Sequence, residues 1–362
     1  MTNPTLRRWI RKYFSHPEAV ILAVLLVLGF AVVLLLGRML APVLASVVIA
    51  YLLEAPVAFL VRHRIPRLPA VLFVFSIFLA FLLFLTLGLA PLLSQQITQL
   101  VQELPNMIAR GQRALLLLPE RYPNFVTEAQ VAELFAGVRA NVTRLGQTLL
   151  SVSLASLSHL FTTIVYLVLL PVLVFFFLKD KDQILGWLVN YLPQERGIAT
   201  RIWKEMDLQI GNYVRGKFAE ILIVGVVTYA AFGVFGLNYA MLLGALVGLS
   251  VIVPYVGAVA VTVPVLLIAF FQWGWSANLG YLTATYLVIQ ALDANLLVPW
   301  LFSEAVNLHP IAIIVAVLFF GGVWGLWGVF FAIPLATLVK AVISAWPRSL
   351  PAPPPDTPAA AA

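Results

Sequence analysis

Polar side chains are rare in the second half of the sequence, and three of them lie close together in one apolar stretch. Asp293 stands near the middle of residues 279–302, with Gln290 three positions before it and Asn295 two positions after it. Residues three apart share a face of an α-helix, so Gln290 and Asp293 are predicted to form one polar surface. Such a surface suits contact with a small solute or a cation. The alternative is a carboxylate that only hydrogen-bonds to neighbouring helices.

Glu220 is a second candidate, because it opens another apolar stretch and follows Lys217 by three residues. The two side chains are predicted either to form a solvated ion pair or to take part in ion coupling. The sequence contains no cysteine and no zinc-protease, phosphate-loop or nucleophile–base pattern. We therefore expect neither enzyme activity nor a metal site nor a cofactor.

Two long apolar stretches, residues 240–271 and 310–343, are each interrupted in the middle. The interrupting residues are Pro254, Tyr255 and Gly257 in the first stretch, and Gly322, Gly325 and Gly328 in the second. Proline removes a helical hydrogen-bond donor and glycine weakens a helix, so backbone groups there are free to meet a solute. The alternative is simple helix packing, as expected for small residues such as Gly244 and Gly248.

The composition defines the surroundings of these residues. Hydrophobic residues make up 62% of the chain and charged residues 10%, whereas soluble domains have about 25% charged residues. Lipid must therefore be the solvent for much of the surface. The net charge of +7 does not indicate a nucleic-acid partner, because the basic residues flank apolar stretches as membrane topology requires. The predicted class is an all-α polytopic membrane protein.

Four membrane-spanning runs are predicted in the first half, and Arg38 alone separates the first two, which predicts a tight turn there. The runs are Ala19 to Gly37, Met39 to Val61, Pro69 to Leu93 and Leu154 to Leu178. In the second half, residues 240–271 and 310–343 are either tilted spans, giving about eight transmembrane segments, or re-entrant hairpins, giving six spans and two hairpins. The hairpin version forms an inverted repeat. Its weak internal similarity pairs Asn238, Gly257 and Pro264 with Asn307, Gly325 and Pro334.

The basic residues orient the chain. Sixteen of the 22 Lys and Arg cluster at the N-terminus, at residues 62–67, at residues 179–217 and near the C-terminus. The positive-inside rule places these segments, and both termini, in the cytoplasm.

The predicted divisions follow this topology. They are a tail (1–18), transmembrane helices 1–3 (19–93), an extracytoplasmic helical lobe (94–153), transmembrane helix 4 (154–178), cytoplasmic amphipathic helices lying along the membrane face (179–217), a transmembrane transport region (218–345) and a disordered Pro/Ala-rich tail (346–362). Apolar residues at helical spacing, such as Ile97, Leu100 and Leu104, mark the lobe as helical.

Several motifs together resemble one family. They are Tyr213 to Lys217 ahead of Glu220, Ile252 to Gly257, Gln290 to Asn295 followed by Pro299, and Leu308-His309-Pro310 followed by Gly322, Gly325, Gly328 and Pro334. In this order, over about residues 10–345, they resemble the autoinducer-2 exporter family of PerM-like permeases.

The resemblance implies a secondary carrier of the bacterial inner membrane that assembles as a homo-oligomer, with a pentamer as one possibility. Its partners would be the lipid bilayer and a small molecule or ion, such as an autoinducer-2-like solute. The alternatives are a sodium or lithium/proton antiporter and a membrane scaffold that transports nothing. This chain has Glu54 where the family often has Asn, and Ser303-Glu304 where Gly is common. Cation coupling therefore stays open.

Overall fold

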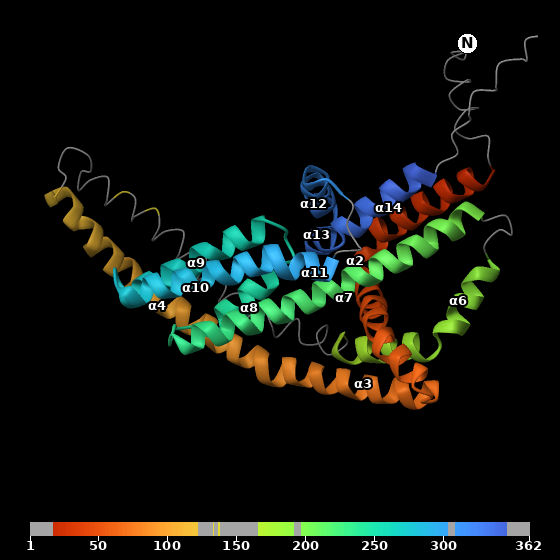
Figure 1. Cartoon of the computed structure of the whole chain (residues 1–362), viewed down its shortest axis with the longest axis horizontal. Helices are drawn as coiled ribbons and strands as arrows, with labels where there is room; N and C mark the ends of the chain where they lie inside the picture. The colour runs from red at the N-terminus through yellow and green to blue at the C-terminus, as the bar shows by residue number, and fades with distance from the viewer. Residues whose placement is uncertain are drawn as a thin grey trace, which may run out of the picture. The chain divides into compact units, whose positions relative to one another are not determined.

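The computed structural model describes residues 17–121, 166–191, 197–302 and 308–345, with single positions at 133 and 137. Within these ranges the chain is helical and contains no strand, which confirms the all-α class (Figure 1). Much of the predicted lobe, the first part of the fourth span and the C-terminal tail lie outside the described residues. The chain divides into two compact units, residues 42–181 with 212–304, and residues 1–41 with 182–211 and 305–362.

Helix α2 (Pro17–Arg62) runs without interruption through Arg38. The predicted tight turn between the first two spans is therefore wrong. Arg38 is a good helix former, and the neighbouring Gly37 is tolerated inside a helix at a cost of about 1 kcal/mol. A single charge marks a change in hydropathy, but nothing in the backbone ends the helix there.

A second continuous helical segment extends from Arg67 to Arg121. It consists of α3 (Arg67–Leu83), a π-helical stretch η1 (Phe84–Leu89) and α4 (Ala90–Arg121). The helix therefore passes through Ser94, the predicted boundary between the third span and the lobe. Met107 and Ile108 are buried, in agreement with the helical spacing of the apolar residues.

The basic segment after the fourth span forms α6 (Lys181–Asn190) and the first part of α7 (Gly197–Val234). Because α7 continues through Lys217 into the next apolar stretch, residues 197–217 are part of one long helix and not a separate one. The predicted amphipathic pattern is confirmed, since Ile202 and Met206 are buried against Ala341.

The first interrupted stretch forms a helical hairpin of α8 (Ala240–Ser250) and α9 (Val256–Trp273). At its base, the Asn238 backbone N–H donates to the Gln272 Oε1 atom over 2.8 Å, and Gln272 Nε2 donates to the Gly236 carbonyl over 2.8 Å. Residues at the two ends of the stretch are thus neighbours. Leu243 and Ile268 share one buried cluster, so the two helices run antiparallel.

A close backbone approach closes the turn of this hairpin. A Cβ atom on Gly257 would collide with the carbonyl oxygen of Ser250. Tyr255 has a φ of 63°, a strained conformation for a residue with a side chain. Residues 240–271 therefore form a helical hairpin and not one continuous helix.

The second interrupted stretch also doubles back. Helix α12 (Pro310–Trp324) leads into α13 (Leu326–Phe330) and α14 (Ala332–Ala345). Ala316 and Phe320 of α12 pack against Ala332 of α14. A Cβ atom on Gly328 would collide with the Phe320 carbonyl oxygen, so Gly328 has the role that Gly257 has in the first hairpin. The internal similarity of the sequence paired Gly257 with Gly325. In the structure Gly325 instead forms the turn, with a positive φ of 60°.

The remaining helices complete the first unit. Helix α10 (Ala277–Leu292) continues into a π-helical stretch η2 (Asp293–Leu297) and α11 (Val298–Phe302). Tyr286 and Leu282 of α10 are fully buried against the hairpin and α7. On α8, Cβ atoms at Gly244 and Gly248 would press on Tyr229 and Gly225 of α7, which confirms the expected packing role of these two glycines.

By length and composition, five helices among the described residues could cross a membrane. They are Met39–Arg62, Arg67–Gln112, Ile202–Val234, Val256–Trp273 and Ala277–Phe302. Further apolar helices are shorter and include Tyr166–Lys179, Ala240–Ser250 and Pro310–Trp324. This pattern fits a polytopic membrane protein.

Candidate functional site

Lys217 and Glu220 lie one turn apart on α7 and form a buried ion pair. The Lys217 Nζ atom is 2.7 Å from Glu220 Oε2, and the side chains are only 6% and 3% exposed. The predicted pair therefore exists, but it is buried rather than solvated. Taking two charges out of water is costly, so the fold must support this pair with further contacts.

Lys217 makes those further contacts. Its Nζ atom donates a 2.9 Å hydrogen bond to the carbonyl of Val251, the residue that ends α8 at the hairpin turn. It also lies 5.2 Å from the centre of the Phe302 ring. The C-terminal end of a helix carries partial negative charge, and an aromatic face attracts a cation. Lys217 thus links α7 to the hairpin turn and to α11.

Gln290 and Asp293 lie where α10 changes into the π-helical stretch η2. Single π-helical turns occur frequently at functional sites. Gln290 Nε2 and Asp293 Oδ1 are both buried, and neither has a partner at hydrogen-bond geometry within the described part of the chain; the Gln290 amide lies near the Tyr286 hydroxyl. A buried polar atom without a partner costs about 1 to 3 kcal/mol. Two such atoms on residues three apart indicate a site where a ligand, water or ion supplies the missing hydrogen-bond partners.

Electrostatic interactions link the three charged residues Lys217, Glu220 and Asp293. Asp293 interacts with the charges of both Lys217 and Glu220. We call Lys217, Glu220, Gln290 and Asp293 the Asp293 cluster. With both carboxylates ionised, the cluster holds two negative charges and one positive charge. Its net charge is therefore −1, which one proton or one monovalent cation would neutralise. Among the described residues, no group of three or more His, Cys, Asp and Glu could hold a metal ion.

Two hydroxyl groups meet beside this polar surface, one on α10 and one on α9. Tyr286 is fully buried one turn before Gln290, and its hydroxyl is 3.0 Å from Thr262 Oγ1 of α9. This contact joins α10 to the hairpin on the face that carries Gln290. It extends the polar surface into an otherwise apolar core.

The other sequence candidates lie in different surroundings. Asn295 is exposed, and its Nδ2 atom donates to the carbonyl of Ala291 on its own helix over 2.8 Å. Pro254, Tyr255 and Gly257 form the hairpin turn just after Val251. Gly322, Gly325 and Gly328 belong to the other compact unit. The structure therefore brings Asp293, Gln290 and Glu220 together and leaves Asn295 outside.

Glu54 has two cationic partners. Its carboxylate oxygens are 3.3 Å from Arg67 Nη2 and 3.1 Å from Lys181 Nζ. Arg67 also donates to the carbonyl of Leu178 over 3.0 Å. Glu54 thus ties α2 to α3 and to the start of α6, which favours a structural role over cation coupling.

Sequence reasoning missed the central position of Lys217. A signal was present, because Lys217 is the last basic residue before more than one hundred residues without Lys or Arg. A charge at the edge of so long an apolar region is a candidate for burial. The contact with the Val251 carbonyl and the π-helical turn have no comparable sequence signal.

Comparisons with known proteins identify the family of this chain. The sequence profile described as "AI-2E family transporter" matches residues 19–348. The chain is 47% identical over 342 residues to PerM of Escherichia coli K12, which is named as a permease, and the match covers 94% of this chain and 97% of PerM. It is 27% identical to the Bacillus subtilis protein YueF, over 81% of this chain and 80% of YueF. It is 26% identical to the AI-2 transport protein TqsA of E. coli K12, over 88% of this chain and 91% of TqsA. The chain therefore belongs to the AI-2E family of membrane transporters.

Proposed function

We propose that this chain is a secondary transporter that moves a small solute across the bacterial inner membrane, and that the solute or a coupling ion binds at the Asp293 cluster. One observation carries the proposal. Asp293 Oδ1 and Gln290 Nε2 are buried without partners, close to a hairpin turn that is joined to the cluster by Lys217. Secondary transporters commonly bind their substrates where helices are interrupted.

The proposed cycle uses the two hairpins. A turn such as residues 251–257 supplies carbonyl groups and exposes them when the hairpin moves, and the turn containing Gly322, Gly325 and Gly328 would serve the opposite side of the membrane. Solute access then alternates between the two sides. The basic residues at the ends of the chain support cytoplasmic termini.

The transported species is a separate part of the proposal. An autoinducer-2-like solute is supported by the similarity to TqsA, whose name states that it transports AI-2. A sodium or lithium/proton antiporter is the second candidate, and the excess negative charge of the Asp293 cluster supports it. A scaffold that transports nothing would gain no advantage from buried polar atoms without partners.

The test is transport by purified protein in proteoliposomes, with autoinducer-2 and with sodium under an imposed pH gradient. Asp293→Asn removes the ionisable group and keeps the shape, so it should abolish transport while leaving expression and oligomeric state unchanged. Asn295→Ala is the matched control, because Asn295 lies two residues away with its side chain bonded to its own helix. Wild-type rates in Asp293→Asn would refute the role of the cluster. Absence of flux of any tested species with the wild-type protein would favour the scaffold.

A further inference from the structure

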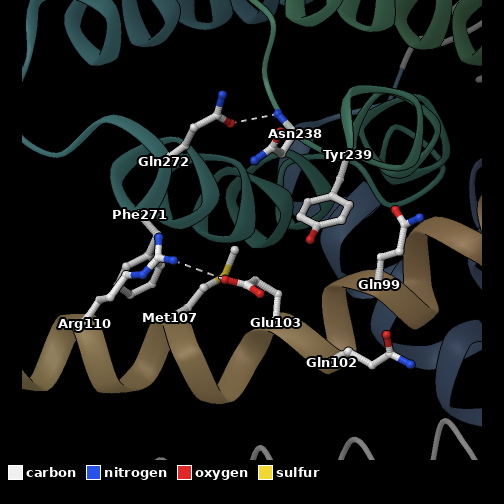
Figure 2. Close-up of a pocket in the computed structure, with 9 residues that line it drawn as sticks. All are labelled: Gln99, Gln102, Glu103, Met107, Arg110, Asn238, Tyr239, Phe271 and Gln272. Carbon is white, nitrogen blue, oxygen red and sulfur yellow. Dashed lines mark hydrogen bonds and ion pairs between the residues drawn. The ribbon is translucent and has the colours of Figure 1, made fainter.

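A cavity of 470 Å³ lies far from the Asp293 cluster, at the base of the α8–α9 hairpin (Figure 2). One wall is a face of α4 that carries Gln99, Glu103 and Arg110, and the opposite wall contains Tyr239 and Gln272. Helix α9 separates the base of the hairpin from its turn, and its 18 residues span about 27 Å at about 1.5 Å per residue. The volume falls in the range of about 300 to 1,000 Å³ that is typical of small-molecule sites.

Hydrogen bonds hold the two walls in place. The side chain of Gln272 uses both of its polar ends to close the hairpin base, on Asn238 and Gly236. On the other side, the Leu242 backbone N–H at the start of α8 donates to Gln96 Oε1 of α4 over 2.9 Å. The cavity is therefore preformed, and ligand binding would not be weakened by the free-energy cost of ordering its walls.

The charges inside the cavity balance each other. Arg110 Nη2 lies 3.5 Å from Glu103 Oε1, as the dashed line in Figure 2 marks. The second carboxylate oxygen, Glu103 Oε2, accepts from Asn106 Nδ2 over 3.1 Å. The carboxylate thus has partners for both oxygens, and the cavity offers no unbalanced charge to an ionic ligand. An uncharged ligand fits this balance best.

Other polar groups in the cavity are available to a ligand. Within the described ranges, no hydrogen bond engages the side-chain amide of Gln99 or the hydroxyl of Tyr239, and Figure 2 shows these two groups between the walls. Partial burial, and then the nearby Glu103 carboxylate, raise the pKa of Tyr239, so its hydroxyl stays a hydrogen-bond donor at neutral pH. Tyr239 also has a φ of 61°, a strained backbone of the kind that clusters at ligand sites.

These groups select a type of ligand. The amide of Gln99 and the phenol of Tyr239 can both donate and accept hydrogen bonds. A hydroxyl group on a ligand can also do both, so it complements either side chain. The ring of Phe271 adds an apolar face to the same cavity (Figure 2). We propose that the cavity is a second binding site, separate from the Asp293 cluster, for a small uncharged solute that carries several hydroxyl groups.

The test uses the full-length protein in lipid nanodiscs and saturation-transfer NMR. The probes are ribose and inositol, with glycine betaine as a zwitterionic comparison and succinate as an anionic one. Ribose or inositol should give the signal. Tyr239→Phe and Gln99→Leu should each weaken binding about three- to tenfold, as the loss of one hydrogen bond predicts. Gln95→Leu, an exposed position on the same helix, should bind like wild type.

The outcomes separate this proposal from the transport site. Asp293→Asn should keep full binding of the hydroxyl-rich probe even if it stops transport. Binding that is unchanged in both Tyr239→Phe and Gln99→Leu would overturn the proposal, and so would the absence of signal from ribose and inositol. A signal from glycine betaine alone that Arg110→Gln abolishes would also overturn it, since the cavity would then recognise opposite charges.

Discussion

The ammonium group of Lys217 lies 2.7 Å from the carboxylate of Glu220, with both side chains almost completely buried. A buried pair of this kind adds little net stability, because the desolvation cost of the two ions offsets most of their attraction. Here Lys217 also bonds to the carbonyl of Val251 at the hairpin turn. A change in the charge of Glu220 is therefore expected to alter the contact between Lys217 and the hairpin turn.

Loss of one partner should destabilise the protein strongly. Lys217→Met leaves Glu220 as an uncompensated buried charge, which costs about 3 to 5 kcal/mol. The double variant Lys217→Met/Glu220→Met should recover a large part of that stability, because it removes both charges. Thermal unfolding followed by fluorescence-detected gel filtration measures both effects. A single variant that melts at the wild-type temperature would contradict the burial of the pair.

The two turn glycines should tolerate no side chain. Cβ atoms at Gly257 and Gly328 would collide with the backbone carbonyls of Ser250 and Phe320, and a backbone atom cannot move away as a flexible side chain can. Gly257→Ala and Gly328→Ala should each destabilise by at least about 1 to 3 kcal/mol. Gly322→Ala is the control, since apart from the adjoining backbone of its own helix no atom lies within 4 Å of the added Cβ. Equal yields of folded, monodisperse protein from all three variants would argue against the two close approaches.

Hydropathy predicted the class of protein and most helical segments, but not where helices end. The chain is helical through Arg38 and through Lys217, although both residues lie at boundaries between apolar and basic sequence. Hydropathy indicates whether a segment prefers lipid or water. The end of a helix depends instead on backbone groups, caps and breaks. Pro254 and Gly257 are breaks of that kind, and there the predicted interruption is confirmed.

Part of the candidate site followed from spacing. Gln290 and Asp293 lie on one helix face, and each has a buried atom without a partner in the described structure. The spacing of Lys217 and Glu220 likewise predicted their pair. The contact of Lys217 with Val251, 34 residues further along the chain, depends on how α7 packs against the hairpin. No local pattern encodes such a contact, so tertiary structure was needed to find it.

The distribution of basic residues predicts that both termini and residues 179–217 are cytoplasmic. Alkaline phosphatase is active only outside the cytoplasm, so a fusion at Gly197 should be inactive and a fusion at Gln112 active. Green fluorescent protein fusions at the same two positions should give the opposite result, which controls for expression. An active phosphatase at Gly197 together with an inactive one at Gln112 would reverse the proposed topology.

The last prediction separates a re-entrant hairpin from a continuous span at residues 240–273. Val234 and Trp275 are highly exposed and flank the hairpin on either side. Since α8 and α9 double back, these two positions should lie on the same side of the membrane, whereas a continuous span would place them on opposite sides. The chain has no cysteine, so Val234→Cys and Trp275→Cys each introduce a single reactive thiol. Both should react with a membrane-impermeant maleimide added to intact cells, and Gly197→Cys should react only after the membrane is opened. Labelling of Val234→Cys and Trp275→Cys from opposite sides would show that the stretch crosses the bilayer as one span.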